Sequence, residues 1–295
     1  MMAKAAWIAK QTDVRLVREL FPVRKRDTHK GDYGKVLLLC GSEGLSGAAR
    51  LAARAALRCG SGLVYLGVPR QIYGIAAANA GSEIVFPLPC DAEGRLSLAA
   101  LAPICARMEQ MDAVLLGCGL GRSDEVTALC QAIIQRCHVP LVLDADGINA
   151  MAGHMDVLRG SACPMVLTPH GGEFLRLGGD PLNADPVAEA MRIAQESGCI
   201  VLLKGWRTIA TDGLAVYRNT TGNPGLATGG SGDVLAGMIV SLLGQHVMPL
   251  EAAAGAAWLH GAAADLAAKH VGEYSLLPED VLDALPRLLK HIGGV

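Results

Sequence analysis

The chain has 295 residues, of which 51% are hydrophobic and 18% charged, and its formal net charge at pH 7 is -2. This apolar composition predicts a large buried core, and the small net charge argues against a protein that binds nucleic acid through a basic surface. The nine cysteines are scattered without a Cys-x-x-Cys pair, mostly inside apolar segments, which favours a reducing, cytoplasmic setting.

The N-terminal segment carries charge without a long apolar stretch. Residues 1–20 lack the apolar core of a secretory signal, and no segment of the chain is apolar enough for long enough to span a bilayer. Residues 13–26 are amphipathic and predict a leading helix or arm, so we expect residues 1–27 to precede the main fold. Residues 31–34 superficially resemble a phosphate loop, but the strand expected at 36–39 follows them where such a loop would open a helix. They are therefore predicted to be a loop that leads into the first core strand.

From there, short apolar strands alternate with helices. Strands are expected at 36–39, 63–68, 84–86, 113–116, 140–143, 165–167 and 200–203, and a hairpin at 208–210 and 215–217. Helices are expected at 48–59, 99–108, 123–137, 234–243, 250–269 and 278–291. This alternation predicts an α/β fold with a mostly parallel sheet covered by helices on both faces. No repeat or Pro-rich linker interrupts it, so a single domain over residues 1–295 is expected.

Glycine-rich or polar segments follow the strands. Because parallel strands end at one edge of a sheet, the residues that come next should meet there, which is where ligands bind in open α/β sheets. The residues expected at this rim are Gly47, Gly121, Asp146, His170, Lys204 and Asp233.

The segment from Gly222 to Asp233 predicts an anion site at the start of a helix. Glycines let a ligand approach the main chain, and the first N–H groups of the helix have no partner within it. The anion would lie on Gly229, Gly230, Ser231 and Gly232. At the first turn of the helix, Asp233 would be ionised and able to accept a proton from a hydroxyl, or it would simply cap the helix.

The other polar residues of the rim have two interpretations each. His170 lies in a loop, where it either contacts a ligand or does not. Asp144, Asp146 and Glu173 are able to bind Mg²⁺ directly or through water, or to cap the helices that follow, and capping is preferred for Glu173. Lys204 suits a phosphate but is also acceptable as an ordinary surface lysine.

Seven motifs occur in a fixed order along the chain. They are Lys-Gly-x-Tyr-Gly at 30–34, Gly-Ser-x-x-x-Ser-Gly-Ala-Ala at 41–49, Gly-x-Gly-Leu-Gly at 117–121, Asp-Ala-Asp-x-x-Asn at 144–149, Thr-Pro-His-x-Gly-Glu at 168–173, Lys-Gly-x-x-Thr at 204–208 and Gly-Asn-x-Gly-x-Ala-x-Gly-Gly-Ser-Gly-Asp at 222–233. Together they resemble the ADP- or ATP-dependent NAD(P)H-hydrate dehydratases, and the resemblance covers roughly residues 28–290.

The resemblance implies a ribokinase-like, three-layer αβα fold and a repair reaction. ADP or ATP, with Mg²⁺, would phosphorylate the C6 hydroxyl of the S epimer of hydrated NADH or NADPH (NADHX or NADPHX), and loss of phosphate would restore the dinucleotide. Ala49, Gly121 and His170 correspond to positions that contact the hydrate, and Asp233 to the catalytic position that also contacts it. The adenine-nucleotide positions correspond to Lys204, Gly205, Trp206, Arg207, Thr208 and Gly232.

Two positions depart from the family pattern. Cys118 stands where the family usually has Pro, and Gly171 is often Pro as well, so both loops are expected to be more mobile. Many family members carry an epimerase domain ahead of this one. Since the first motif begins near Lys30, a stand-alone dehydratase is expected here, served by a separate epimerase. The resemblance further suggests ADP as the donor and a homotetramer.

Two rival function classes remain open. The first is a kinase of the same fold that acts on a vitamin precursor such as a hydroxymethylpyrimidine or a hydroxyethylthiazole, which the motifs at 168–173 and 204–208 make less favoured. The second is a nucleotide-binding module without turnover, against which Asp233 argues, because a protein that only binds needs no base there.

Overall fold

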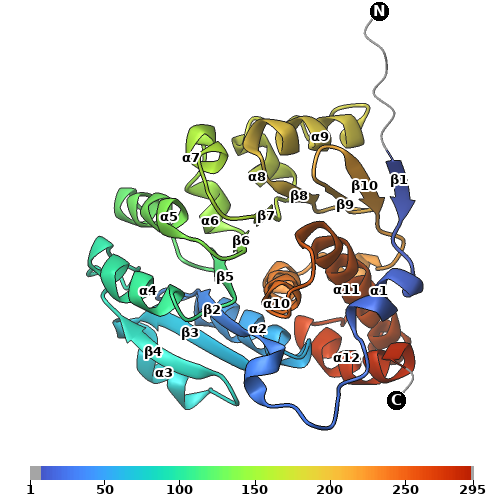
Figure 1. The fold of residues 1–295 in the computed structure, drawn as a ribbon, viewed down its shortest axis with the longest axis horizontal. Coiled ribbons are helices and arrows are strands. Elements are labelled where there is room, and N and C mark those ends of the chain that lie inside the picture. Colours follow the sequence, from blue (N-terminus) through green and yellow to red (C-terminus); the bar gives the residue numbers. More distant parts are fainter. Residues whose placement is uncertain (1–7, 294–295) are drawn as a thin grey trace, which may run out of the picture.

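The computed structural model describes residues 8–293, which form one sheet between two layers of helices (Figure 1). The strands are β1 (Ile8–Gln11), β2 (Lys35–Leu39), β3 (Leu63–Pro69), β4 (Ile84–Leu88), β5 (Ala113–Leu116), β6 (Leu141–Leu143), β7 (Met165–Leu167), β8 (Ile200–Leu203), β9 (Ile209–Thr211) and β10 (Ala215–Arg218). Their order across the sheet is β1-β10-β9-β8-β7-β6-β5-β2-β3-β4. Within the described residues only β9 pairs in an antiparallel manner, with β8 and β10.

The helices cover both faces of this sheet. They are α1 (Val14–Leu20), α2 (Ser46–Arg58), α3 (Tyr73–Ala78), α4 (Leu101–Met108), α5 (Asp124–Arg136), α6 (Asp146–Asn149), α7 (Met155–Arg159), α8 (Gly171–Arg176), α9 (Pro186–Ser197), α10 (Ser231–Gly244), α11 (Pro249–Val271) and α12 (Pro278–Gly293). Short 3₁₀ helices lie at Lys30–Tyr33, Arg70–Ile72, Leu98–Ala100 and Pro224–Leu226. None of the described helices is both long and apolar enough to cross a membrane.

Successive side chains along a strand point to opposite faces of the sheet, so the strands contribute to two hydrophobic cores, one on each face of the sheet. In β2, Val36 and Leu38 join the core under α2, α10, α11 and α12, whereas Leu37 and Leu39 join the core under α4, α5 and α9. All four side chains are completely buried, as expected for a strand covered on both faces. The expected α/β fold with a mostly parallel sheet is confirmed. The nine cysteines, all within the described residues, are unpaired.

The structure differs from the expected elements at the N-terminus and in the Gly-rich segment, and it contains helices α3, α7 and α9, which were not among the expected helices. Residues 8–11, expected to belong to a leading arm, form β1 and pair in parallel with β10 at the edge of the sheet. Helix α10 begins at Ser231, three residues before the expected start at 234, because Gly230 takes the left-handed conformation (φ 94°) that opens the helix. The expected loop at 31–34 is mostly a 3₁₀ helix.

The order of the strands reverses direction between β2 and β5, and open α/β sheets bind ligands at such a point. The chain moves outward from β2 through β3 to β4 and then returns to the other side of β2 with β5, so the loops after β2 and β5 leave in opposite directions. These two loops contact each other directly, because Gly41 N–H donates to the carbonyl of Cys118 (2.8 Å) and Ser42 Oγ donates to that of Gly119 (2.9 Å). A ligand is therefore expected at the carboxyl ends of β5 and its neighbours.

Candidate active site

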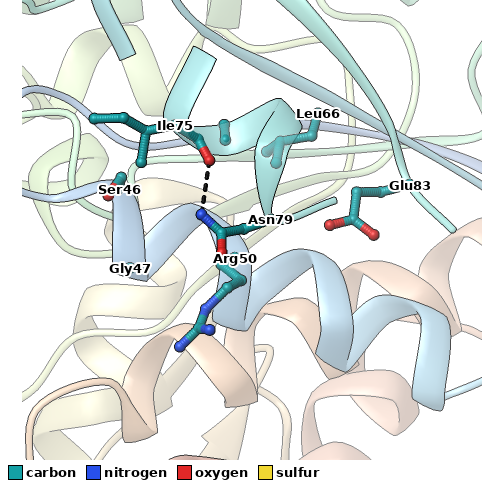
Figure 2. A pocket seen from close by; sticks show the side chains of 8 residues that line it. Ser46, Gly47, Arg50, Leu66, Ile75, Asn79 and Glu83 are labelled. Atoms are coloured by element: carbon teal, nitrogen blue, oxygen red, sulfur yellow. Dashed lines mark hydrogen bonds between the residues drawn. The ribbon is translucent and has the colours of Figure 1, made fainter. Parts of the chain in front are cut away.

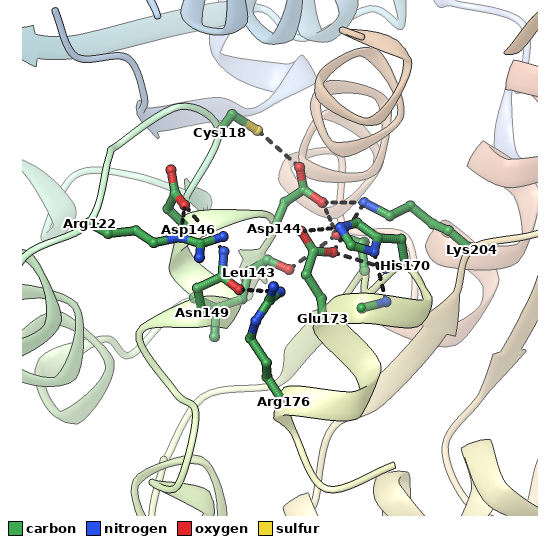
Figure 3. Close-up of polar contacts among 12 residues, drawn as sticks. Cys118, Arg122, Leu143, Asp144, Asp146, Asn149, His170, Glu173, Arg176 and Lys204 are labelled. Carbon is green, nitrogen blue, oxygen red and sulfur yellow. Dashed lines mark hydrogen bonds and ion pairs between the residues drawn. The ribbon is translucent and has the colours of Figure 1, made fainter. Parts of the chain in front are cut away.

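A buried ion pair between Asp144 and Lys204 lies at the centre of the polar cluster in Figure 3. Asp144 follows β6, Lys204 follows β8, and the Lys204 Nζ atom lies 2.8 Å from Oδ1 of Asp144. Thr168, which follows β7 between them, donates its hydroxyl to the same carboxylate oxygen at 2.6 Å. The side chains of Asp144 and Lys204 are 2% and 19% exposed. The interpretation of Lys204 as an ordinary surface lysine is therefore wrong.

Helix α8 contributes the second carboxylate near Lys204. Glu173 accepts the backbone N–H of His170 at 2.9 Å in a capping box, as expected for this residue, and its carboxylate also lies 3.3 Å from Nε2 of His170 and 3.7 Å from Nζ of Lys204. His170 is the N-cap of the helix, and its Nδ1 accepts the N–H of Gly172 at 3.0 Å. The His170 side chain is 56% exposed, so it lies at the open side of the cluster.

The loops after β5 and β6 are joined through Asp146. Its carboxylate accepts the N–H of Gly121 at 2.9 Å and pairs with Arg122 at 3.1 Å. Between the two aspartates, Ala145 has φ 47° and ψ -113°, a strained conformation for a residue with a Cβ. The approach of the loops is also close, since a Cβ on Gly117 would lie 1.8 Å from the carbonyl oxygen of Asp144. With this backbone conformation, the Asp144 side chain contacts Lys204 and the Asp146 side chain contacts the loop after β5.

Asp233 reaches the same cluster from the first turn of α10. It is the third residue of the helix, whose N-cap is Gly230, so the capping role considered for Asp233 is not the one it has. One ligand atom each from Cys118, Asp144 and Asp233 lie within 4.8 Å of one another. Asp233 thus faces another carboxylate across a short gap.

The environment of Asp233 raises its pKa. Burial is the largest cause and the charge of Asp144 adds to it, whereas the Cys118 thiol and the Lys204 ammonium act in the opposite direction, and the pKa rises from 3.8 to about 6. The helix N-terminus was expected to favour the anion, and burial outweighs that effect. With this pKa about 90% of the carboxylate is still ionised at pH 7, and its proton affinity suits a general base better than that of an exposed aspartate does.

The Gly-rich segment ends beside the same cation. Gly232 lies next to Lys204, because a Cβ built on it would be 3.4 Å from Nζ of Lys204. The Oγ atom of Ser231 is buried and has no hydrogen-bond partner among the described residues. The N–H groups of Gly232 and Asp233 lie in the first turn, where no helical carbonyl is available to them. Unpaired donors near an ammonium group suit an anion, and the anion site expected from the sequence stays a prediction.

Beyond Lys204 the chain forms an exposed turn. Trp206 is 86% exposed, and the guanidinium of Arg207 lies 4.2 Å from the centre of its ring. Arg207 has a positive φ of 62°, and Thr208 closes the turn by donating its hydroxyl to the carbonyl of Gly205 at 3.0 Å. The turn presents a flat aromatic surface next to the buried lysine.

The start of α2 lies at the same edge of the sheet but outside the carboxylate cluster. A Cβ on Gly119 would lie 2.9 Å from that of Ala48, so this helix touches the loop after β5. Gly47 lines a neighbouring cavity of about 200 Å³ (Figure 2) together with Ser46, Arg50, Leu66, Ile75, Ala76, Asn79 and Glu83. Ala49 is completely buried. The structure therefore does not bring Ala49 into the cluster, and its expected contact with the hydrate stays a prediction.

The three carboxylates considered as Mg²⁺ ligands are already engaged. Asp144 accepts from Lys204, Thr168 and Cys118, Asp146 accepts from Gly121, Arg122 and Asn149, and Glu173 accepts from His170 and lies against Lys204. The remaining group of donors, Cys118, Asp144 and Asp233, includes a thiol, which Mg²⁺ does not favour. We assign no protein ligand for Mg²⁺.

Two residues of the cluster were not recognised from the sequence as part of it. Thr168 and Cys118 both hydrogen-bond Asp144, at 2.6 and 3.4 Å. Each lies one or two residues after the end of a buried strand, and this position in the sequence is the signal that could have identified both as site residues. From the sequence, Cys118 was notable only because it stands where the family usually has proline.

Comparison with known proteins fits this geometry. The sequence profile of the NAD(P)H-hydrate dehydratase family matches residues 36–287, which include every strand from β3 to β10 and the whole polar cluster. The chain belongs to the NAD(P)H-hydrate dehydratase family. The resemblance noted from the seven motifs is thereby confirmed.

Relatives within the family differ in length. The bifunctional NAD(P)H-hydrate repair enzyme Nnr of Moorella thermoacetica is 44% identical over 280 residues, which are 93% of this chain and 53% of the relative. The ADP-dependent (S)-NAD(P)H-hydrate dehydratase of Neisseria meningitidis is 37% identical over 260 residues, 86% of this chain and 83% of the relative. This dehydratase-family chain spans about half the length of the first of these relatives.

A solved structure has the same architecture. The ADP/ATP-dependent NAD(P)H-hydrate dehydratase of Bacillus subtilis, co-crystallised with ATP and Mg²⁺, superposes with a TM-score of 0.80 at 29% identity, over 96% of this chain and 98% of the other. The expected ribokinase-like three-layer fold of this family member is confirmed.

Proposed function

We propose that this protein is an ADP- or ATP-dependent (S)-NAD(P)H-hydrate dehydratase that restores NADH and NADPH from their C6 hydrates. The proposal is carried by the position of Asp233, a half-buried carboxylate with a pKa of about 6 at the end of a Gly-rich segment whose Gly232 lies next to Lys204. This arrangement provides a base and an anion site within one turn of a helix. The names and coverage of the relatives from Neisseria and Bacillus support the choice of substrate.

The first chemical step is a phosphoryl transfer. The hydrate would lie over the cluster near Gly121 and His170, and Asp233 would take the proton of the C6 hydroxyl as its oxygen attacks the terminal phosphorus. ADP then leaves from ATP, or AMP from ADP. Charge on the transferring group would be stabilised by the backbone N–H groups of residues 229–232 and by Lys204. The exposed Trp206 ring would stack on the adenine, with Thr208 and its neighbours at the rest of the nucleotide.

The second step removes phosphate from C6. Phosphorylation turns hydroxide into a good leaving group, so the lone pair of the ring nitrogen N1 can expel it and form an N1=C6 iminium. Loss of a proton from C5 then gives the C5=C6 double bond of the reduced nicotinamide. The overall change is loss of one water, with cleavage of one phosphoanhydride bond.

The remaining features of the proposal follow from the resemblance and from the chain itself. Mg²⁺ would arrive with the phosphates of the nucleotide, because the carboxylates of the site are engaged by protein donors. We further propose that residues 1–295 form one dehydratase domain, that an epimerase converts the R epimer, that the protein is a homotetramer, and that it is located in the cytoplasm, which the unpaired cysteines support.

The decisive assay follows absorbance at 340 nm while the protein, Mg²⁺ and either ADP or ATP act on hydrated NADH. Return of the reduced-nicotinamide band identifies the reaction and the preferred donor together, and Asp233→Asn should lower kcat by roughly 100-fold to 10,000-fold. No return of the band, with nucleotide consumed in the presence of vitamin precursors, would move the function to a kinase. No turnover with any acceptor would leave a binding module.

A further inference from the structure

The start of the Gly-rich segment is attached to α11 through Asp265. One carboxylate oxygen of Asp265 accepts the N–H of Gly222 at 2.9 Å, and the other accepts the side-chain amide of Asn223, also at 2.9 Å. Asp265 is half-buried and belongs to the 23-residue helix α11, many of whose side chains lie in the core. One carboxylate therefore fixes two successive residues of the segment to a well-packed helix.

Asn223 connects this attachment to the next turn. Its side-chain oxygen accepts the N–H of Gly225 at 3.0 Å, so Asn223 is the N-cap of the short 3₁₀ helix Pro224–Leu226. Because an ionised carboxylate only accepts hydrogen bonds, the amide must present its NH₂ group to Asp265 and its oxygen to Gly225. The three hydrogen bonds thus form one chain in which the orientation of each group is determined.

The residues just before this point also lie against α11. Thr221 donates its hydroxyl to the carbonyl of Trp258 at 2.7 Å. Gly261 permits this approach, because a Cβ at that position would collide with the Thr221 hydroxyl. The chain is therefore held along α11 from Thr221 to Gly225.

The backbone between this anchor and α10 is more open. Residues 227–229 are exposed, and a Cβ on Gly229 would meet no atom within 4 Å. Ala227 N–H donates to the carbonyl of Pro224 at 3.0 Å, which is a contact within the segment itself. The position of these exposed residues therefore depends on the anchored residues before them and on α10 after them.

We propose that Asp265 is a positioning residue of the reaction, which holds the Gly-rich segment through Gly222 and Asn223 so that the N–H groups of residues 229–232 meet the transferring phosphoryl group. The inference rests on the proposed function of that segment. Asp265 acts through these two residues and does not itself touch the reacting groups. Such donors must be in place before the reaction, and a displacement of about 1 Å can cost roughly 100-fold in rate.

The hydrogen bonds can be exchanged between the two side chains, which makes the role testable. In Asp265→Asn, every orientation of the two amides leaves one NH₂ group facing another donor. In Asn223→Asp, two carboxylates face each other. In the double variant Asn223→Asp/Asp265→Asn, the new amide at position 265 accepts from Gly222 and donates to the new carboxylate at position 223, which accepts from Gly225. All three hydrogen bonds and the net charge are then restored.

The kinetics of NADH recovery from hydrated NADH should follow this pattern. Each single variant should lower kcat roughly 10-fold to 100-fold and change the KM for nucleotide by less than about threefold, because the displaced donors act mainly in the transition state. The double variant should return kcat to within about threefold of the wild type, since the two substitutions are coupled through one hydrogen bond.

Asp212→Asn is the matched control. Asp212 also accepts two backbone N–H groups, those of Leu214 and Ala215 at 2.9 and 2.8 Å, in the turn between β9 and β10. Since β9 runs antiparallel to β8, this turn lies at the edge of the sheet away from Lys204. The control should keep the wild-type kcat. If the double variant does not recover, or if the single variants lose activity only in proportion to their folded fraction, the inference is overturned and Asp265 merely stabilises the fold.

Hydrogen exchange measured by mass spectrometry gives a readout without turnover. Peptides that cover residues 222–233 should exchange about fivefold faster in Asp265→Asn than in the wild type, and at the wild-type rate in the double variant. Unchanged exchange in these peptides refutes the role of Asp265. If the wild-type protein fails to restore NADH while the exchange responds as stated, the proposed function fails and the attachment of the segment by Asp265 stands.

Discussion

Replacement of Asp233 by Asn should make the protein more stable at neutral pH while it removes turnover. The folded state raises the pKa of this carboxylate from 3.8 to about 6, chiefly through burial. A change of about two pKa units corresponds to about 3 kcal/mol, since each unit is worth 1.36 kcal/mol. Asparagine has nearly the same shape and carries no charge, so the variant should recover most of this free energy of unfolding.

The sign of the effect sets its pH window. Because the folded state binds this proton more tightly than the unfolded chain does, the stability that protonation contributes is complete below pH 3.8 and is lost as pH rises through about 6. The wild-type protein therefore bears the full cost of the buried charge above pH 7. The advantage of Asp233→Asn should be near zero at pH 4 and about 3 kcal/mol at pH 8.

Urea unfolding of the two proteins between pH 4 and pH 8 measures this difference directly. Asp124→Asn provides the control, because Asp124 is an exposed acid in the first turn of α5 and should lose at most a few tenths of a kcal/mol. If Asp233→Asn is less stable than the wild type at pH 8, or if the difference does not vary with pH, then burial of the charge is not what raises the pKa of Asp233, and the argument for a tuned base fails.

Three further outcomes are expected. Lys204→Met should lower the free energy of unfolding at pH 7 by about 3 kcal/mol, measured in urea, because Asp144 and Glu173 would lose their cation in a buried site; an exposed lysine would give no such loss. Trp206→Ala should weaken ADP binding by roughly fivefold in calorimetry and leave the urea midpoint unchanged, since its ring is 86% exposed; unaltered affinity would remove the ring from the nucleotide site. Gly171→Pro should raise stability by about 0.4–1 kcal/mol in thermal unfolding, because Gly171 is the first residue of α8 and a Cβ there meets its nearest neighbour at 3.4 Å; a lower Tm would show that the loop does not accept the ring.

The sequence predicted the layers of the fold because each strand carries its own signal. Apolar segments of three to seven residues, followed by glycine or a polar residue, can each be recognised as a strand without knowledge of the others. All strands from β2 to β10 were predicted in this way. The same reasoning placed Asp146, Lys204 and Asp233 at the carboxyl edge. The edge strand β1 was missed because its sequence, Ile-Ala-Lys-Gln, has little apolar character and its place in the sheet depends on pairing with β10, far away in the chain.

The partners within the site could not be predicted in this way. That Lys204 pairs with Asp144 depends on β6, β7 and β8 being neighbours in the sheet, and the order of strands is a property of the whole fold. The shape of the loop at Ala145 and the start of α10 at Ser231 depend on close backbone contacts in the same way. The raised pKa of Asp233 follows from burial, which local sequence does not report.

The arrangement of charges explains why the base that we propose, Asp233, is tolerated at this site. Asp233 is costly at neutral pH because it is a half-buried anion near Asp144, and the same two facts would suit it to act as a base, since they raise its affinity for a proton. Lys204 limits that cost without neutralising Asp233 directly, because its closest contact is to Asp144. A direct ion pair between Lys204 and Asp233 would be more stable, but it would return the pKa of Asp233 toward that of an ordinary aspartate and weaken it as a base. For the base that we propose at Asp233, the pairing of the cation with Asp144 is therefore the feature that would keep its affinity for a proton high at this helix terminus.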